Sequence, residues 1–344
     1  MTAYGQYTQV EILSQPEAWT TALGDLNRQL DDLRRQVAAQ QYAQVIFTGC
    51  GSTYYLSIAA ASLFRELTGV PSRGLPASEL WLEPQSYFRP KEKALLVAVS
   101  RSGETSETLR ACQVFRDMNF GDILTFSCYP GCSLVRLGDT NILLPSGQED
   151  SVAQTRAFST LYLGTMVLAA SWAEKPELIA ELNLLPDVCR RLLQDYAPLA
   201  RQIGTDADLE RFYFLGSGSR YGLACELSLK MKEMSLSHSE PFHFLEFRHG
   251  PKSMATPGAL VIGLLSEPRY AQESQVLSEM RVQGARTLTF GEAGADVLFA
   301  SGVSPVVRNL LYLPVGQLVA YEHAMSRGLN PDRPENLTVF VELK

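Results

Sequence analysis

Hydrophobic and polar residues follow one another along the chain in blocks that predict strands and helices in alternation. An apolar, β-branched run that begins at Gln44 (VIFTG) ends in a Gly/Ser turn and is followed by an alanine-rich helical stretch. Further buried strands are expected at Leu95–Val99, Ile123–Phe126 and Ile142–Leu144, with a helix at Ser106–Met118. Strands that alternate with helices predict a parallel sheet covered on both faces, which is the α/β class.

The same arrangement returns in the second half of the chain. The segment FYFLGSGSRYGLACELSL echoes VIFTGCGSTYYLSIAAAS, so that Gly49 aligns with Gly216 and Gly51 with Gly218. Strands of this second copy are expected at Arg211–Leu215, Ala259–Leu265, Arg286–Phe290 and Leu310–Val315. A duplicated strand, turn and helix predicts two similar three-layer α/β domains, each a parallel sheet flanked by helices.

Helical segments frame these two copies. A helix is expected from Pro16 to Ala39, and a long helical region from Thr155 to Tyr196 is interrupted at Pro176 and Pro186. At 344 residues the chain exceeds what one hydrophobic core usually supports. We therefore expect a helical segment at residues 1–40, a first domain at 41–170, a helical connector at 171–200 and a second domain with a tail at 201–344.

The helix expected from Tyr221 to Ser237 carries the main candidate for acid–base chemistry. At about 100° per residue, one stripe of this helix is apolar, and Glu226, Lys230 and Glu233 lie beside it on a common face. Such a face is either solvated and held by ion pairs or partly buried. The next segment favours burial, because it places His243, Glu246 and His249 among three phenylalanines, and burial moves pKa values towards neutrality.

A separate pattern indicates an anion site in the first copy. Directly after the strand LLVAV, the hydroxyl residues Ser100, Ser102 and Thr105 surround Gly103 at the start of a helix. Unpaired N–H groups at a helix start attract anions, and glycine lets a ligand approach the backbone, so this loop suits a phosphate. An N-terminal helix cap is the other interpretation. The turn at Gly49 ends an adjacent strand and lacks the third glycine of a dinucleotide motif, so no cofactor is expected.

Composition narrows the functional classes. The net charge of −7, with no basic run, argues against nucleic acid as a partner. Neither an apolar run of about 18 residues nor a leader peptide is present in the sequence, so we expect no membrane partner and a cytoplasmic location. The six cysteines are scattered and form no zinc pattern, so we expect no metal site and most of them as small core residues.

An ordered set of motifs then shows a resemblance to a known family. GCGST, SRSGET, SVAQTRAF, ELSLKMKE, HGP and PENL follow one another over roughly residues 40–340. Together they resemble the SIS (sugar isomerase) family, and are most similar to the isomerase part of glucosamine-6-phosphate synthase and to the related amino-sugar-phosphate deaminases and fructosamine-phosphate deglycases.

The resemblance implies a role for each matching residue. Glu233 resembles the base that moves a proton between C1 and C2, with Glu226 and Lys230 in support. His249 resembles the histidine that assists opening of the sugar ring and that reaches the site of a second subunit, which implies at least a homodimer. The residues implied to hold the sugar phosphate are Ser52, Thr53, Ser100, Arg101, Ser102 and Thr105, with Val152, Ala153 and Gln154 along the sugar.

The sequence also departs from the family pattern. Gln154 and Arg156 replace the usual Ser/Thr and Lys, Val339 stands where the synthase-like tail carries a lysine, and no glutaminase half is present, so we expect no glutamine hydrolysis. We expect an enzyme that isomerises, or releases an amine from, an amino-sugar phosphate or fructosamine 6-phosphate. A non-catalytic sugar-phosphate-binding protein is the alternative, and the sequence does not choose between these substrates.

Overall fold

The computed structural model describes residues 4–33, 41–89 and 91–338, and these residues form two compact units. Unit 1 comprises residues 4–16, 150–155 and 184–337, and unit 2 comprises the other described residues. The short segments 4–16 and 150–155 thus pack with the later part of the chain. This grouping does not follow the sequence order of our expected domain boundaries, and those boundaries stay predictions.

Unit 2 is built on a parallel sheet in the order β2-β1-β3-β4-β5. Its strands are β1 (Gln44–Gly49), β2 (Ser72–Pro76), β3 (Ala94–Val99), β4 (Gly121–Ser127) and β5 (Thr140–Leu143). Four of them were predicted. The sequence analysis missed β2, because its residues SRGLP contain no apolar run and it lies at the sheet edge.

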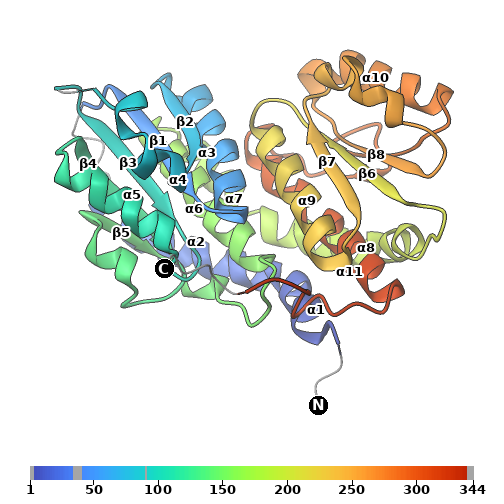
Figure 1. Ribbon diagram of the computed structural model, residues 1–344, viewed down its shortest axis with the longest axis horizontal. Helices are drawn as coiled ribbons and strands as arrows, with labels where there is room; N and C mark the ends of the chain where they lie inside the picture. The colour runs from blue at the N-terminus through green and yellow to red at the C-terminus, as the bar shows by residue number, and fades with distance from the viewer. Residues whose placement is uncertain (1–3, 34–40, 90, 339–344) are drawn as a thin grey trace. The chain divides into compact units, whose positions relative to one another are not determined.

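Helices cover both faces of this sheet, as the left half of Figure 1 shows. On one face, Phe47 of β1 packs against Phe64 of α3 (Ser52–Thr68), which meets Trp172 of α6 (Arg156–Trp172). On the other face, α4 (Ala77–Leu82) and α5 (Ser106–Asp117) cover a cluster that includes Phe88, Phe115 and Phe120. The remaining helices of unit 2 are α2 (Gln15–Leu33) and α7 (Pro176–Leu182).

Unit 1 has a second parallel sheet with the corresponding strand order β7-β6-β8-β9-β10. Its strands are β6 (Arg211–Leu215), β7 (His238–Phe242), β8 (Ala259–Leu264), β9 (Arg286–Gly291) and β10 (Val297–Leu298). The helices are α1 (Gln6–Leu13), α8 (Leu185–Gly204), α9 (Ser219–Ser235), α10 (Tyr270–Val282) and α11 (Leu313–Ser326). The predicted fold class, two similar α/β domains with parallel sheets, is confirmed.

The two sheets also correspond in register. Phe47 of β1 pairs with Val97 of β3, and in unit 1 Phe214 of β6 pairs with Ile262 of β8. Each first strand leads into a turn that places a glycine with positive φ before the helix, Gly51 at 55° and Gly218 at 63°. The left-handed conformation is open to glycine at little cost, which explains why both copies of the turn carry it.

One predicted strand is wrong. The segment Leu310–Val315 forms the end of a 3-10 turn, Val307–Tyr312, and the first residues of α11. It reads as a strand because α11 is buried over most of its length, and a short apolar run has no periodicity that separates a buried helix from a strand. Pro314 in the first turn of α11 agrees with the helical state.

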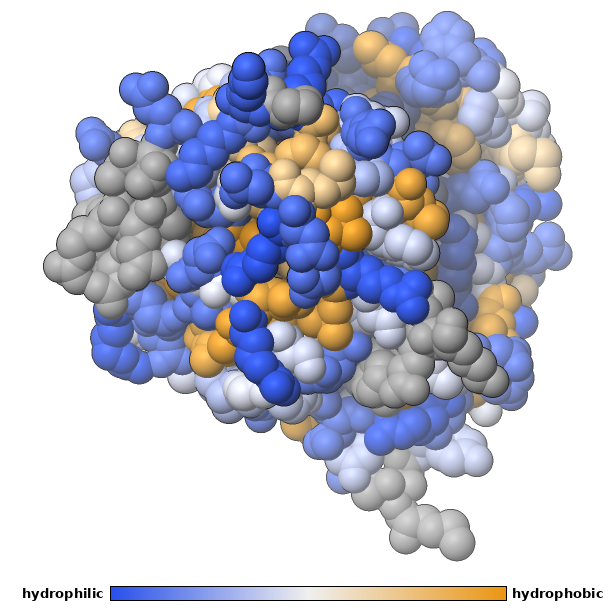
Figure 2. Space-filling view, turned by 60° about the vertical axis from the view of Figure 1, so that its left-hand side comes forward, coloured by the Kyte–Doolittle hydropathy of each residue, from blue (hydrophilic) through white to orange (hydrophobic). Residues whose placement is uncertain are grey.

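The surface of the protein carries both hydrophobic and hydrophilic residues. Figure 2 shows one face of the molecule, on which hydrophobic groups lie among hydrophilic residues. Scattered exposed apolar side chains, such as Leu82 and Met118, occur on most proteins and do not by themselves indicate a partner. Within the described residues, no helix combines the length and apolar character needed to cross a membrane.

Candidate functional site

The loop after β3 folds around its own hydroxyl groups. Ser100 Oγ accepts a hydrogen bond from the Gly103 N–H (3.1 Å) and lies 3.3 Å from Thr105 Oγ1. Ser102 Oγ accepts from the Glu104 N–H at 3.2 Å. Thr105 is the N-cap residue of α5, but its side chain makes no capping hydrogen bond. The structure therefore gathers the predicted hydroxyls at the start of α5, and the alternative interpretation, a helix capped by these side chains, does not hold for Thr105.

Gly103 is the residue that shapes this loop. Its φ of 69° lies in the left-handed region, and a Cβ atom at this position would come within 2.1 Å of Cys132 Sγ. A side chain here would therefore force Cys132 to move. The close contact holds the loop against the segment after β4, where the Leu134 N–H donates to the Gly103 carbonyl (3.0 Å). The backbone of the loop is fixed before any ligand arrives.

Carboxylates outnumber the arginine among the charged residues of the loop and its surroundings. Arg101 is buried at 5% exposure and lies 3.5 Å from the carboxylate of Glu149, which is also buried. Glu104 accepts a hydrogen bond from the Ser133 N–H, and Glu107 lies in the first turn of α5. Because the carboxylates offset the arginine, recognition of an anion at this loop must rest on N–H and O–H groups.

The turn after β1 lies at the same edge of the sheet, since β1 and β3 are parallel neighbours. A Cβ on Gly51 would meet no atom within 4 Å, so the turn has open space on that side. Thr53 is buried, and its hydroxyl exchanges hydrogen bonds with the backbone of Cys50 at 2.9 and 3.0 Å. Ser52 is also buried. The Thr53 side chain therefore stabilises the turn through its hydrogen bonds to the backbone. Both predicted anion motifs lie at the carboxyl ends of adjacent strands, where open α/β sheets bind ligands.

In unit 1, a buried ion network is formed by three side chains of α9: Glu226, Lys230 and Glu233. Lys230 Nζ lies 3.3 Å from a carboxylate oxygen of Glu226 and also pairs with Glu233. The side chains of Glu226 and Lys230 are 0% exposed, whereas that of Glu233 is 19% exposed. The interpretation of this face as solvated is wrong, and the expectation of partial burial is confirmed. Only Glu233 of the three has a side chain that reaches solvent.

Electrostatics keep the centre of this network charged. Burial acts to lower the pKa of Lys230, but the two neighbouring carboxylates outweigh it and raise that pKa above its ordinary value. The network therefore leaves one carboxylate, that of Glu233, beside solvent and in contact with a charged ammonium group.

His249 belongs to a segment on the other face of the same sheet. Successive residues of a strand point to opposite faces. Phe212 of β6 contacts His323 of α11 (ring centroids 5.0 Å apart), and α9 packs on this face with α11. Tyr213 instead contacts Phe247, two residues before His249, at 5.3 Å. His249 is exposed. Within unit 1 the structure therefore places the segments that carry Glu233 and His249 on opposite sheet faces.

The segment with Val152, Ala153 and Gln154 also lies in unit 1. Val152 N–H donates to the Asp332 carbonyl (3.0 Å), and Ala153 is 1% exposed. The side-chain oxygen of Gln154 is buried and has no hydrogen-bond partner among the described residues. Glu11 supports this segment by accepting from the N–H groups of residues 150 and 151. The sequence analysis missed Glu11, because nothing in a short N-terminal helix signals a contact so distant in the chain.

A comparison with protein families identifies the fold. The model described as "SIS domain" matches residues 39–171 and 207–298, which is more than half of the chain. The chain belongs to the SIS domain family.

Two curated relatives are glutamine–fructose-6-phosphate aminotransferases. The protein from Shewanella oneidensis is 30% identical over 369 residues, which cover 99% of this chain and 59% of that protein. The protein from Methanothermobacter thermautotrophicus is 28% identical over 352 residues, which cover 99% of this chain and 58% of that protein. The chain thus spans less than two thirds of the length of these relatives.

Two solved structures of other proteins have a similar fold. A glucosamine-6-phosphate deaminase from Thermotoga maritima is 26% identical, with a TM-score of 0.75 and coverage of 95% of this chain and 100% of that one. A tagatose-6-phosphate ketose/aldose isomerase from Escherichia coli is 23% identical, with a TM-score of 0.86 and coverage of 98% and 97%. At that lower identity, the likeness to the isomerase concerns the fold alone.

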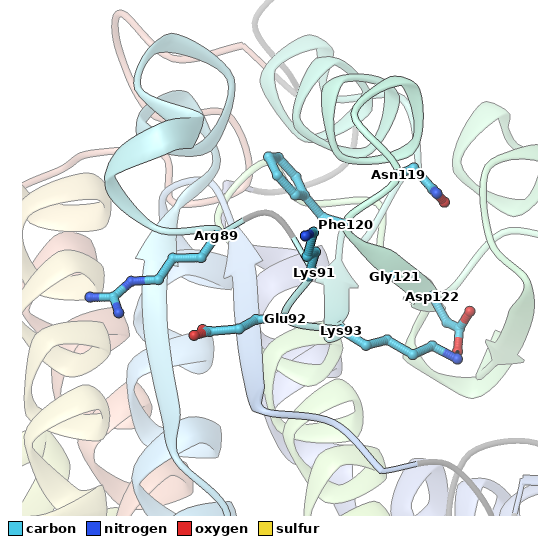
Figure 3. Close-up of a pocket in the computed structure, with 8 residues that line it drawn as sticks. All are labelled: Arg89, Lys91, Glu92, Lys93, Asn119, Phe120, Gly121 and Asp122. Carbon is cyan, nitrogen blue, oxygen red and sulfur yellow. Dashed lines mark ion pairs between the residues drawn. The ribbon is translucent and has the colours of Figure 1, made fainter.

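A cavity of about 360 Å³ lies away from the SIS motif residues. Its lining comes from the segments just before β3 and at the start of β4, so it opens at the amino ends of the strands (Figure 3). Lys93 and Asp122 point toward each other there and form an ion pair of 2.7 Å. Because ligands of parallel sheets bind at the carboxyl ends, we base the candidate site on the motif loops and not on this cavity.

Among the described residues of this SIS chain, no group of three or more His, Cys, Asp or Glu side chains is arranged to hold a metal ion. No disulfide joins any of the six cysteines, all of which lie in the described part of the chain, and five of them are buried. Burial raises the pKa of the Cys50 thiol, in the turn after β1, to about 11, so this thiol is not an activated nucleophile at neutral pH.

Proposed function

We propose that this SIS protein is an enzyme that acts on an amino-sugar phosphate or a fructosamine 6-phosphate by proton transfer between C1 and C2. The observation that carries the proposal is the ion network of α9, in which buried Glu226 and Lys230 leave Glu233 as the partly exposed carboxylate. The names of the relatives support the substrate class, since they act on fructose 6-phosphate or glucosamine 6-phosphate.

In this proposal Glu233 is the base. With the sugar open, the Glu233 carboxylate takes the proton from the carbon beside the carbonyl, and the electrons of that C–H bond form a C1–C2 double bond. The carbonyl π electrons pass to oxygen, which takes a proton from water, and this gives an enediol or enolamine. The carboxylic acid then returns its proton to the other carbon while the enol or enamine group loses one to water, which gives the isomeric carbonyl or an imine that water hydrolyses to release the amine. Lys230 is a positioning residue, because its buried ammonium group contacts the carboxylate that acts as the base.

The loops of unit 2 anchor the substrate in this proposal. The N–H groups at the start of α5 and the hydroxyls of Ser100, Ser102 and Thr105 bind the phosphate, as the geometry of the loop after β3 supports. Holding the phosphate restricts the motion of the open sugar, so that positioning contributes to the rate. Gln154, with its buried side-chain oxygen, is proposed to contact the sugar.

We propose further that His249 assists ring opening in a second copy of the chain. The separation of the Glu233 and His249 segments on opposite sheet faces favours this arrangement. A two-fold dimer would then hold equivalent sites. Mixing the inactive variants Glu233→Gln and His249→Asn should restore about a quarter of the parent activity, because random exchange gives half hybrids with one intact site each. A monomer in light scattering at assay concentration, or mixtures without recovery, would contradict the shared site.

The experiment that tests the proposed function is a substrate panel. Phosphorylated and unphosphorylated sugars, amino sugars and fructosamines are screened by thermal shift, and compounds that bind are assayed for isomerisation and amine release. We expect turnover of a phosphorylated compound and loss of its binding in a Ser102→Ala/Thr105→Val variant, since each lost charge-assisted hydrogen bond costs about 1.5–3 kcal/mol. Equal binding of phosphorylated and unphosphorylated sugars would refute the phosphate loop.

One observation favours a second candidate, a sugar-phosphate-binding protein without turnover. Val339 stands at the position of the lysine in the synthase-like tail, and this residue lies outside the described part of the chain. The same panel separates the two candidates, because a thermal shift by a sugar phosphate without isomerisation or amine release would support the binding protein.

A further inference from the structure

A buried ion pair lies at the carboxyl edge of the sheet in unit 1. Arg220 follows the Gly/Ser turn after β6, and its Nη2 lies 2.9 Å from Oε1 of Glu273 in the first turn of α10. The two residues are 7% and 2% exposed. Glu273 also accepts hydrogen bonds from Ser266, at 2.6 Å from the backbone N–H and at 3.3 Å from the hydroxyl. A carboxylate thus receives donors from the turn after β6 and from the loop after β8.

This place corresponds to the proposed phosphate site of unit 2. The strands β1 and β6 match in register, as do β3 and β8, so the turn of Arg220 corresponds to the turn of Thr53. The strands β3 and β8 have equal length, which makes Ser266 the counterpart of Arg101 in the SRSGET loop. The N–H group that Ser266 gives to Glu273 therefore has its counterpart in the anion loop of unit 2.

The donors around Glu273 exceed what one carboxylate uses. Nε of Arg220 is buried and has no hydrogen-bond partner among the described residues. A guanidinium carries five N–H donors, and a phosphate has more acceptor oxygens than a carboxylate. Burial raises the pKa of Glu273, and the nearby Arg220 does not fully offset this effect. The donors around Glu273 therefore do not fully compensate its carboxylate for the loss of water.

A second arginine near this position is already paired with carboxylates. Arg308, also at the carboxyl edge, pairs with Glu267 and lies 3.7 Å from Glu292, and it donates to the Val303 carbonyl at 3.1 Å. The positive charge that faces Glu273 therefore comes chiefly from Arg220, with a smaller contribution from the exposed Arg269.

We propose that unit 1 retains a second anion site, formed by Arg220 and Ser266, and that the carboxylate of Glu273 is its built-in occupant. The site takes a small oxyanion of the phosphate or carboxylate class when Glu273 is removed. In the parent protein Glu273 closes it, which restricts each chain to one sugar phosphate. This last consequence rests on the proposed function, whereas the anion site itself does not.

Chemical rescue tests the proposal. Glu273→Ala is made in the Ser102→Ala/Thr105→Val background, and thermal unfolding is followed with inorganic phosphate or formate, at ionic strength matched with chloride. We expect both anions to raise the unfolding temperature of the Glu273→Ala protein in a saturable way, with phosphate binding at least about tenfold tighter than to the background protein. The further change Arg220→Met should abolish the gain.

Each other outcome decides against the site. Equal anion dependence with and without Glu273→Ala would make Arg220–Glu273 a structural ion pair only, as would a gain that survives Arg220→Met. If Glu273→Ala does not fold, Glu273→Ser also shortens the side chain and removes the charge, and phosphate must bind this variant more tightly than it binds the background protein. Failure of the phosphate loop would be seen separately, as unchanged phosphate binding in the background protein relative to the parent.

Discussion

Replacing Lys230 with methionine should destabilise the protein strongly. Lys230 is completely buried on α9 and is the cation between Glu226 and Glu233. Methionine fills a similar volume, so the main change is the loss of the ammonium group. The change leaves the carboxylate of Glu226, which is also completely buried, without its cation.

The size of the effect follows from burial. Removing one partner of a buried ion pair typically costs about 3–5 kcal/mol, because an uncompensated charge stays in the interior. The raised pKa of Lys230 shows that the lysine is charged in the folded state throughout the neutral range. In the variant, the carboxyl of Glu226 can escape the cost by binding a proton, so its folded pKa should rise above the unfolded value of about 4.3. The folded variant then holds more protons than the unfolded chain, and its deficit relative to the parent should shrink as the pH falls from 7 to 5.

Urea unfolding of the parent and variants measures this. We expect Lys230→Met to lose about 3–5 kcal/mol at pH 7, and Glu226→Gln added to it to recover at least about 1 kcal/mol, since the two residues are coupled. Lys232→Met, on the exposed side of the same helix, is the matched control and should stay within about 0.5 kcal/mol of the parent. A loss below about 1 kcal/mol for Lys230→Met would refute the buried network as a stabilising element.

Two further predictions concern glycine and histidine. Gly103→Ala should lower the free energy of unfolding more than Gly69→Ala does. Both glycines have a φ near 70°, which costs about 1–2 kcal/mol for alanine, but a Cβ at Gly69 meets no atom within 4 Å whereas one at Gly103 would meet Cys132. Equal losses in urea unfolding would contradict this. Burial lowers the pKa of His323, which lies 2.8 Å from the Gly204 carbonyl and 3.1 Å from a serine hydroxyl. The unfolded chain then binds more protons than the folded protein, so the free energy of unfolding should fall as the pH drops below about 6.5. His323→Asn should flatten this pH dependence between about pH 5 and 7. An unchanged slope in the variant would show that His323 does not titrate in this range.

Much of the fold could be predicted because its central strands have a clear local signal. The strands β1, β3, β6 and β8 are short apolar runs, and β1 and β6 end in a Gly/Ser turn, so their parallel arrangement followed from the alternation with helices. The edge strand β7, with the sequence HSEPF, has no such signal, because its pairing with β6 depends on the tertiary fold. The wrong strand at Leu310–Val315 has the converse cause, since burial on all sides removes the periodicity of a helix.

Part of the candidate site could also be predicted from the sequence, and part of it could not. The spacing of Glu226, Lys230 and Glu233 placed them on one face of a helix, but the same spacing is common on solvated helices, so only the structure could show the burial. The partnership of Arg220 with Glu273 spans separate elements of unit 1 and has no local signature. Contacts of that kind are set by the packing of helices on the sheet, which one sequence does not display.

The central claim is that Glu233 moves a proton at the sugar carbons, and isotope exchange tests it most directly. The parent, Glu233→Gln and the half-exposed control Glu240→Gln are incubated in heavy water with a sugar phosphate that the panel identifies, and deuterium at C2 is followed by NMR. Glutamine preserves shape and removes the base, so we predict that Glu233→Gln still binds the compound while exchange falls by about 10²-fold or more, with Glu240→Gln close to the parent. Exchange by Glu233→Gln at the parent rate would contradict the account and leave Glu233 as a structural ion-pair residue.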